Sequence, residues 1–357
     1  MKKVFDIYYW FLSLSKYLFF DFKLKRVMTS LFVVLISLVK SQDMQFTQFY
    51  AAPLYLNPAF TGANVCSRIS MTYRNQWPGV NTTYQSYLLS FDHYLDAQHV
   101  GIGLQLASDK AGTGGLRTTL INPSFAFETK INKSIGIRFG IQPGVTIKSI
   151  QFDKLLFGDQ ISRGGSSNPT SVATVESPTQ TKTFVDIGAG TLLYTANFWV
   201  GTSFYHLNKP NESMVGASGA FLPIKYSVHG GTKLALNKEE KDSDLRKYIS
   251  AVFNYKGQGK FDQFDLGIYY TMRNVNIGIW YRGLPGFKSY LPGYANNDAV
   301  AFLVGYQAKK INIGYSYDLT ISQLTNRSKG AHEITLAFQL CNQKIKPKRV
   351  VLSCPKF

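Results

Sequence analysis

Apolar and polar residues alternate along most of the chain, and the alternation is clearest near its carboxyl-terminal end. In the segment 311–321, Tyr315 and Leu319 fall among the apolar positions, whereas Asp318 falls among small and polar residues at the intervening ones. Successive side chains of a β-strand point to opposite faces, so this pattern predicts a strand with one apolar and one polar face. The segment 331–340 repeats the pattern after a polar connection that contains glycine. The two segments therefore predict an antiparallel hairpin.

The same period of two recurs through the chain and predicts about fourteen strands. The predicted strands cover 68–77, 84–95, 99–108, 116–130, 135–149, 183–195, 197–207, 225–236, 246–256, 263–273, 275–283, 299–308, 311–321 and 331–340. Several of the intervening segments are only two or three residues long, which is typical of antiparallel neighbours. Pro123 and Pro143 lie inside two predicted strands. Each removes a backbone donor, so we expect a bulge at each position.

Two all-β architectures fit a sheet with one apolar and one polar face. In a soluble β-sandwich the apolar faces pack against each other. In an outer-membrane β-barrel the apolar face meets lipid and the polar face lines the lumen. Strands of about ten residues can cross a bilayer when tilted, and a closed sheet leaves no exposed edge. The pattern favours a transmembrane antiparallel β-barrel of the outer membrane, and the exported sandwich, binding another protein, is the alternative.

Aromatic residues make up 15% of the chain, with 22 Tyr and 26 Phe, which suits strands and the aromatic girdles of membrane barrels. The formal net charge is +18 at pH 7. The basic residues are scattered and often close a predicted strand, as Lys148 and Arg273 do, without forming a dense block with interleaved aromatics. Strongly basic proteins can bind nucleic acid, but this distribution predicts a solvated basic rim instead. We expect no nucleic-acid partner.

The amino-terminal segment has the order of a secretory signal. A basic cluster at 23–26 precedes an apolar run at 31–39, and Ser41 supplies a small residue at the predicted cleavage site. The run is short for a membrane-spanning helix, so we expect 28–41 to be a signal peptide that directs export to the cell outer membrane. Residues 1–27 are interpreted as an upstream extension. The alternative is an unusually long signal or a helical anchor.

Residues 42–340 form the predicted barrel, together with a lead-in that precedes the first strand. The lead-in, 42–62, carries the turn signal Asn57-Pro58, and it either stays periplasmic or packs inside the barrel as a plug. A Ser/Thr/Gly/Pro-rich connection at 153–183 predicts a long loop, and loops of this length are usually functional or disordered. Residues 341–357 form a basic tail, which we expect to be periplasmic and hypothesise to contact a periplasmic partner.

The search for reactive chemistry predicts no catalytic, cofactor-binding or metal-binding residue, and no cofactor. His332-Glu333 resembles half of a zinc-protease signature, but the two residues lie in a predicted strand instead of a helix. Asp318 and His332 lie on adjacent predicted strands, so they either meet inside the lumen or face solvent. We therefore expect the protein not to be an enzyme.

The three cysteines, Cys66, Cys341 and Cys354, lack the spacing of metal ligands. From spacing alone, Cys341 and Cys354 either pair across the tail or remain free thiols. Neither state implies catalysis.

Nine strings are spread along the chain in a characteristic order. They are QDMQFTQFYAAPLYLNPAFTG at 42–62, YRNQW at 73–77, FGDQ at 157–160, FVDIGAGTLLY at 184–194, FWVGTSFYHLNKPNES at 198–213, IGIWYRG at 277–283, GYSYDLTISQL at 314–324, GAHEITLAF at 330–338 and CPKF at 354–357. Together and in this order they resemble the PorP/SprF family of outer-membrane proteins from the type IX secretion and gliding machinery of Bacteroidetes. The resemblance extends over nearly all of 42–357.

The resemblance implies a barrel that docks or anchors other proteins and has no catalytic residues. SprF-like members support secretion or surface attachment of a cognate large protein that carries a type-B sorting domain. PorP-like members link the periplasmic ring apparatus, built of PorK/PorN-like proteins, to the outer membrane. The expected partners are therefore one of these proteins and the lipid bilayer, without a small-molecule substrate. A general diffusion porin is the alternative on the same fold.

Overall fold

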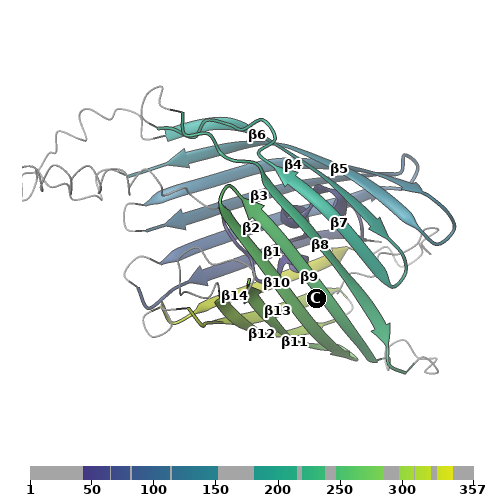
Figure 1. Cartoon of the computed structure of the whole chain (residues 1–357). Helices are drawn as coiled ribbons and strands as arrows, with labels where there is room; N and C mark the ends of the chain where they lie inside the picture. The colour runs from purple at the N-terminus through teal and green to yellow at the C-terminus, as the bar shows by residue number, and fades with distance from the viewer. Residues whose placement is uncertain are drawn as a thin grey trace, which may run out of the picture. The chain divides into compact units, whose positions relative to one another are not determined.

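The structure is a computed structural model of the chain (Figure 1). It describes the residues 43–64, 66–80, 83–112, 115–151, 181–214, 219–237, 247–284, 297–308, 310–322 and 328–340. The chain divides into two compact units, Met1–Met44 and Gln45–Phe357, and everything below concerns the described residues of the second. The predicted signal at 28–41, most of the predicted loop at 153–183 and the tail at 341–357 lie outside the described residues.

Fourteen strands of the described residues close into one antiparallel barrel (Figure 1). They are β1 (Ser67–Gln76), β2 (Tyr84–Leu95), β3 (Val100–Ala111), β4 (Leu116–Lys130), β5 (Gly136–Ser149), β6 (Thr181–Tyr194), β7 (Phe198–Tyr205), β8 (Lys225–Ala235), β9 (Lys247–Gln258), β10 (Phe261–Met272), β11 (Val275–Gly283), β12 (Asn297–Gln307), β13 (Ile311–Thr320) and β14 (Ala331–Leu340). Each strand pairs with its neighbours in sequence, and β1 pairs with β14. Closure gives every strand a paired neighbour on both sides, so the sheet has no edge strand. The predicted strands are confirmed to within a few residues, and the sandwich alternative is wrong.

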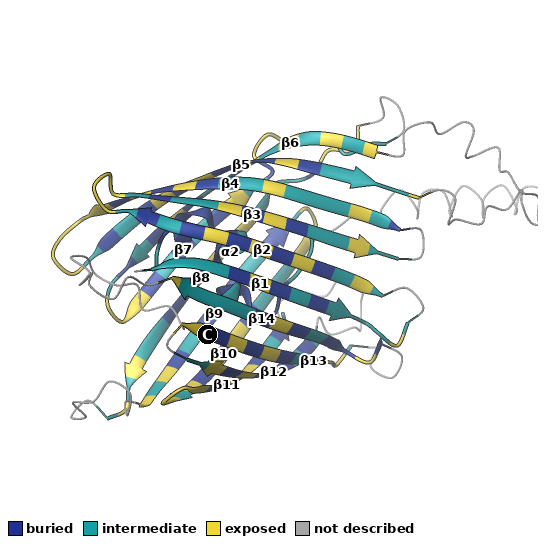
Figure 2. Cartoon of the chain, turned by 180° about the vertical axis from the view of Figure 1, so that it is seen from behind, coloured by how far each residue is buried: buried dark blue, intermediate teal, exposed yellow. Residues whose placement is uncertain are grey.

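Burial alternates along the strands, as the alternating colours of Figure 2 show. On β5 the outward Phe139 and Ile141 are 48% and 57% exposed, whereas Arg138, which directly precedes Phe139 and faces the lumen, is 1% exposed. Outward Tyr315 and Ile334 of the last hairpin are likewise exposed. Exposed apolar and buried polar side chains reverse the arrangement of a soluble protein and suit a barrel in lipid. The outward position expected for the apolar face of this hairpin is confirmed.

The connections differ in length between the two ends of the barrel. At the end where β1 begins and β14 ends, three residues join β6 to β7 and two join β10 to β11. The three longest connections, 150–180, 206–224 and 284–296, all lie at the opposite end. Outer-membrane barrels have short periplasmic turns and longer extracellular loops. We therefore call the first end the short-turn end, facing the periplasm, and the second the long-loop end, facing outward.

The strands that contain Pro123 and Pro143 keep their register. Pairing of β4 with β5 is interrupted between Ile121 and Phe125, and the register on the two sides of the gap is the same. The predicted bulges are wrong, because the two prolines interrupt the same stretch of the ladder from both strands. A bulge would have inserted a residue into one strand only.

Cys66 is disulfide-bonded. Cys341 and Cys354, which we expected either to pair across the tail or to remain free thiols, lie outside the described residues.

Among the described residues, no helix is long and apolar enough to cross a membrane.

The outward face predicts a position-dependent response to charge. Replacing Ile141, in the middle of β5, with Lys should lower the free energy of unfolding by about 2–4 kcal/mol, the cost of a cation at the bilayer midplane. The matched control is Ser134→Lys in the exposed turn before β5, which should change it by less than about 1 kcal/mol. Urea unfolding in liposomes measures both values. Equal effects of the two substitutions would contradict a lipid-facing β5.

Candidate functional site: a plug inside the barrel

The segment that precedes β1 lies inside the barrel instead of beneath it. We call residues 45–62 the luminal plug; it contains η1 (Phe49–Ala51), α2 (Pro53–Leu56) and η2 (Pro58–Phe60). Nearly all of its residues are buried, although it is only eighteen residues long. It contacts walls on opposite sides of the lumen, from β13 and β14 to β5 and β6. Of the two positions expected for the lead-in, the plug is the one observed.

The plug consists of short helical turns because its sequence favours their starts and stops. Pro53 and Pro58 each begin a turn, at a position where the missing backbone N–H costs nothing. The side chain of Asn57 accepts a hydrogen bond of 2.8 Å from the backbone N–H of Ala59 and so caps the second turn. The short turns place apolar side chains on several sides, which suits a segment that is enclosed all round.

A group of buried charges holds the start of the plug towards the long-loop end. The carboxylate of Glu333 on β14 accepts hydrogen bonds of 2.8 Å from the backbone N–H groups of both Thr47 and Gln48. Arg74 on β1 donates to the same carboxylate at 3.1 Å. Glu333 is fully buried, so these partners offset the cost of removing its charge from water. The plug's backbone is thus part of a buried ion pair.

The hydroxyl of Thr47 completes this group. It donates to Asp318 at 2.6 Å and accepts from Arg74 at 2.6 Å and from Arg282 at 3.0 Å. A hydroxyl has one donor and two acceptor sites, so its hydrogen-bonding capacity is filled. Asp318 also pairs with both arginines, at 2.8 Å and 3.0 Å. We call Arg74, Arg282, Asp318 and Glu333 the charged clasp.

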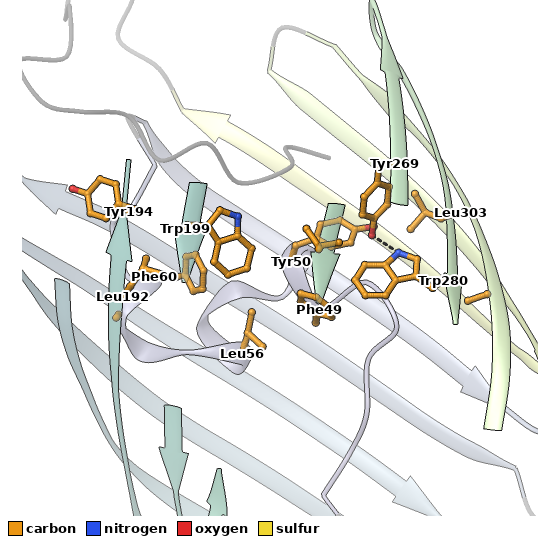
Figure 3. Close-up of a cluster of buried hydrophobic side chains, with 13 residues drawn as sticks. Phe49, Tyr50, Leu56, Phe60, Leu192, Tyr194, Trp199, Tyr269, Trp280 and Leu303 are labelled. Atoms are coloured by element: carbon orange, nitrogen blue, oxygen red, sulfur yellow. Dashed lines mark hydrogen bonds between the residues drawn. The ribbon is translucent and has the colours of Figure 1, made fainter. Parts of the chain in front are cut away.

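Aromatic rings hold the middle of the plug against the wall (Figure 3). Phe49 meets Trp280 edge to face with ring centroids 4.8 Å apart, and Tyr50 meets Tyr269 in the same way at 5.2 Å. Phe60 packs on Trp199 at 5.5 Å. Edge-to-face pairs of this kind are typically worth about 0.5–1.5 kcal/mol beyond their buried area. The cluster excludes water from one side of the plug.

Asn57 joins the plug to two neighbouring strands. Its amide nitrogen donates to the backbone carbonyl of Thr191 on β6 at 2.9 Å and to that of Thr202 on β7 at 3.1 Å. The pairing of these two strands is short, because it covers only Ala189–Tyr194 of β6. A single plug side chain therefore links β6 and β7 from the luminal side, where the ladder between the two strands is short.

The end of the plug is held by a third arginine, Arg138. Arg138 on β5 donates to the backbone carbonyl of Ala59 at 2.9 Å, to the carbonyl of Thr61 and to the carboxylate of Glu128. Tyr194 donates to the other oxygen of Glu128 at 2.8 Å. The cation is 1% exposed and is surrounded by acceptors, so both its charge and its donors are satisfied. The same arrangement recurs at both ends of the plug, with buried charges binding backbone groups.

Two glycines on the wall allow the plug to approach this closely. A Cβ atom at Gly140 would lie 2.3 Å from the backbone nitrogen of Ala59, and one at Gly101 would lie 2.0 Å from the carbonyl oxygen of Thr61. Neither distance leaves room for a side chain. These positions require glycine because the plug's own backbone occupies the space.

Some of the sequence expectations fail at this site. Asp318 and His332 do not meet: Asp318 points inward to the charged clasp, whereas His332 shares the outer face with Tyr315, whose hydroxyl lies 2.9 Å from its ring nitrogen. Strand register places Asp318 opposite Ala331, so His332 faces the other way. His206 directly follows the end of β7, and its Nδ1 lies 2.8 Å from a carboxylate oxygen of Asp186. Among the described residues no group of three potential metal ligands is present.

The charged clasp was not recognised from the sequence, although a signal for it exists. Three of its members lie on strands whose outward face is largely apolar, and each occupies a position on the opposite, polar face. They are Arg74, Arg282 and Glu333. Inward charges in a barrel need either water or partners. The sequence shows such positions but not which of them meet. Chemically, the clasp binds and orients peptide backbone, and the plug supplies hydrogen-bond partners to its charged groups.

Comparison with known families and structures adds a family match. The family model described as type IX secretion system membrane protein PorP/SprF matches residues 38–338. No protein with a curated description matches the chain. The toluene transporter TodX of Pseudomonas putida is 10% identical, with 84% of this chain and 93% of that chain covered and a TM-score of 0.41.

Two further solved barrels have similar values. The CymD monoaromatic hydrocarbon channel is 12% identical, with 81% and 93% of the two chains covered and a TM-score of 0.42. A mutant porin of Rh. blastica is 8% identical, with 77% and 99% covered and a TM-score of 0.31. The family match spans most of the chain and therefore identifies its relatives. The TM-scores of the solved barrels are too low for their structures to be compared with this one in detail.

Because the hydroxyl of Thr47 makes three hydrogen bonds, we expect two substitutions at this position to differ strongly in how firmly the plug is held. Thr47→Val keeps the size of the side chain but leaves both arginines and Asp318 short of one hydrogen bond each, at about 1.5–3 kcal/mol per bond to a charged group. Thr47→Ser keeps the hydroxyl and is the control. We expect chymotrypsin to cleave within 45–62 at least about tenfold faster in the Val variant, in detergent micelles, because the loss of even one such bond is worth a factor of about ten. Equal cleavage of the two variants would show that the hydroxyl does not hold the plug.

Proposed function

The chain belongs to the PorP/SprF family of type IX secretion system membrane proteins, and on this premise we propose that its barrel docks another protein at the outer membrane instead of conducting solutes. The observation that carries the proposal is the luminal plug, which is buried and bound on several sides of the barrel. A diffusion porin needs an open lumen. A docking barrel needs only a rigid wall and accessible ends.

The number of contacts that hold the plug supports the proposal that the lumen stays closed. Three separate groups hold it: the charged clasp at its start, the aromatic cluster in its middle and Arg138 at its end. Breaking a buried ion pair by removing one partner typically costs about 3–5 kcal/mol. Spontaneous opening would disrupt several such groups together, so a closed lumen is the state that the contacts favour.

Two kinds of partner fit the family. One is a cognate large surface protein with a type-B sorting domain, whose secretion or attachment the barrel would support. The other is the periplasmic ring apparatus of PorK/PorN-like proteins, which the barrel would link to the membrane. The first would meet the long-loop end and the second the short-turn end, so the end that is protected by the partner distinguishes them. We further propose that 28–41 is a signal peptide, removed before the plug packs, and that 1–27 is an upstream extension.

Conductance separates docking from diffusion. We expect purified protein in planar bilayers to give no steady open-channel current, because the plug occupies the lumen. A variant that lacks residues 45–61 should conduct, provided that heat-modifiable gel mobility shows a folded barrel. A steady current from the unmodified protein would favour the porin alternative.

The basic tail predicts a separable effect on partner binding. Deleting residues 342–357 should abolish co-purification with a periplasmic partner without removing the protein from the outer membrane, because the tail follows the last strand of a complete barrel. The control is replacement of the tail by a neutral Gly/Ser segment of equal length, which should also lose the partner if charge is responsible. Retained co-purification in both variants would contradict a role for the tail.

A further inference from the structure

The outer surface of the barrel carries a row of polar side chains at its long-loop end. The strand register places the members side by side on seven neighbouring strands, β14 and β1 to β6. They are His332, Asn75, Gln85, Lys110, Arg117, Ser149 and Thr181. The row contains hydrogen-bonding and basic groups and no acidic one. We call it the polar row.

The positions of Lys110 and Arg117 on their own strands place them at the edge of the membrane-crossing part of the wall. Lys110 is the last residue but one of β3, and Arg117 is the second residue of β4. Nearby on β1 and β2, Tyr73 and Tyr87 have ring centroids 4.9 Å apart on the outer face. Tyrosines form girdles at the membrane–water interface, with apolar bodies in lipid and hydroxyls at the headgroups. We therefore place the two cations among the lipid headgroups.

Two cations stand directly opposite each other in this row. Lys110 on β3 is paired in register with Arg117 on β4, and both side chains are exposed on the outer face. Like charges opposite each other on a sheet repel and destabilise the pair. Within the described residues neither side chain forms an ion pair or a side-chain hydrogen bond. An anion between them would convert the repulsion into attraction.

We propose that Lys110 and Arg117 bind the phosphate of a lipid headgroup in the leaflet at the long-loop end. The guanidinium of Arg117 presents paired donors that match phosphate geometry, and Lys110 adds a second point charge. Gln85 and Ser149, which flank the two cations in register, offer further hydrogen-bond donors. The site uses the outer wall only and does not depend on the plug.

A lipid fits this site better than a soluble acidic protein does. The pair lies on the outward face of two membrane strands, and on the same face Ser108 and Thr119 separate it from apolar Leu106 and Ile121. A ligand with acyl chains would cover these apolar side chains and place its phosphate at the cations at the same time. A soluble protein would have to approach across the headgroups of other lipids.

Lipid titration of the full mature chain in detergent micelles tests the proposal, with diphosphoryl lipid A as the probe. The variant Lys110→Gln/Arg117→Gln should bind the probe about tenfold more weakly, because two charge-assisted contacts are lost. The matched control is Lys260→Gln/Lys329→Gln, which removes two exposed cations at the same end but outside the polar row. The control should bind as the unmodified protein does, and Lys110→Arg should also retain binding.

Two comparisons identify the source of the anion. Dephosphorylated lipid A should bind the unmodified protein about as weakly as diphosphoryl lipid A binds the double variant, and inorganic phosphate alone should not compete at the same concentration. Equal binding by the double variant and the control would overturn the proposal, as would full competition by inorganic phosphate. Heat-modifiable mobility of all variants confirms that the barrels compared are folded.

Discussion

The hydrogen bonds between the carboxylate of Glu333 and the backbone of Thr47 and Gln48 determine how this barrel is organised. A closed sheet of fourteen strands has no edge strand, but it encloses inward-facing charges that need partners. The plug supplies them. Glu333 gains two backbone donors, and Arg74 and Arg282 gain the hydroxyl of Thr47 between them. The wall and the plug therefore satisfy each other, and neither has its full set of partners alone.

The same reasoning connects the structure to its proposed role. A barrel whose lumen is occupied by its own chain has only its two ends and its outer wall left for interaction. The ends suit the protein partners expected of this family, and the outer wall meets lipid. Lys110 and Arg117 fit that division, because their side chains lie on the outer wall, where we propose that they bind a lipid phosphate. Docking and lipid binding would then use separate surfaces.

Much of the fold was predictable because it depends on local pattern. Period-two alternation located each strand, and short connections made neighbours antiparallel. The plug was left open as one of two alternatives, since its partners are distant in sequence: Thr47 and Glu333 are separated by 286 residues. A contact between Asp318 and His332 was also left open as one of two alternatives, because the face that each occupies depends on register across a connection, and a shift of one residue reverses it. Register and long-range pairing are what the sequence could not provide.

Hydrogen exchange of the plug's backbone amides, with the protein in lipid nanodiscs, tests the central claim most directly. The amides of Thr47 and Gln48 are predicted to exchange as slowly as those of the neighbouring strands β13 and β14, because the buried carboxylate of Glu333 holds both protons. Exchange at the rate of an unstructured peptide at these two positions would show that the plug is not seated, and would contradict the account of a closed barrel.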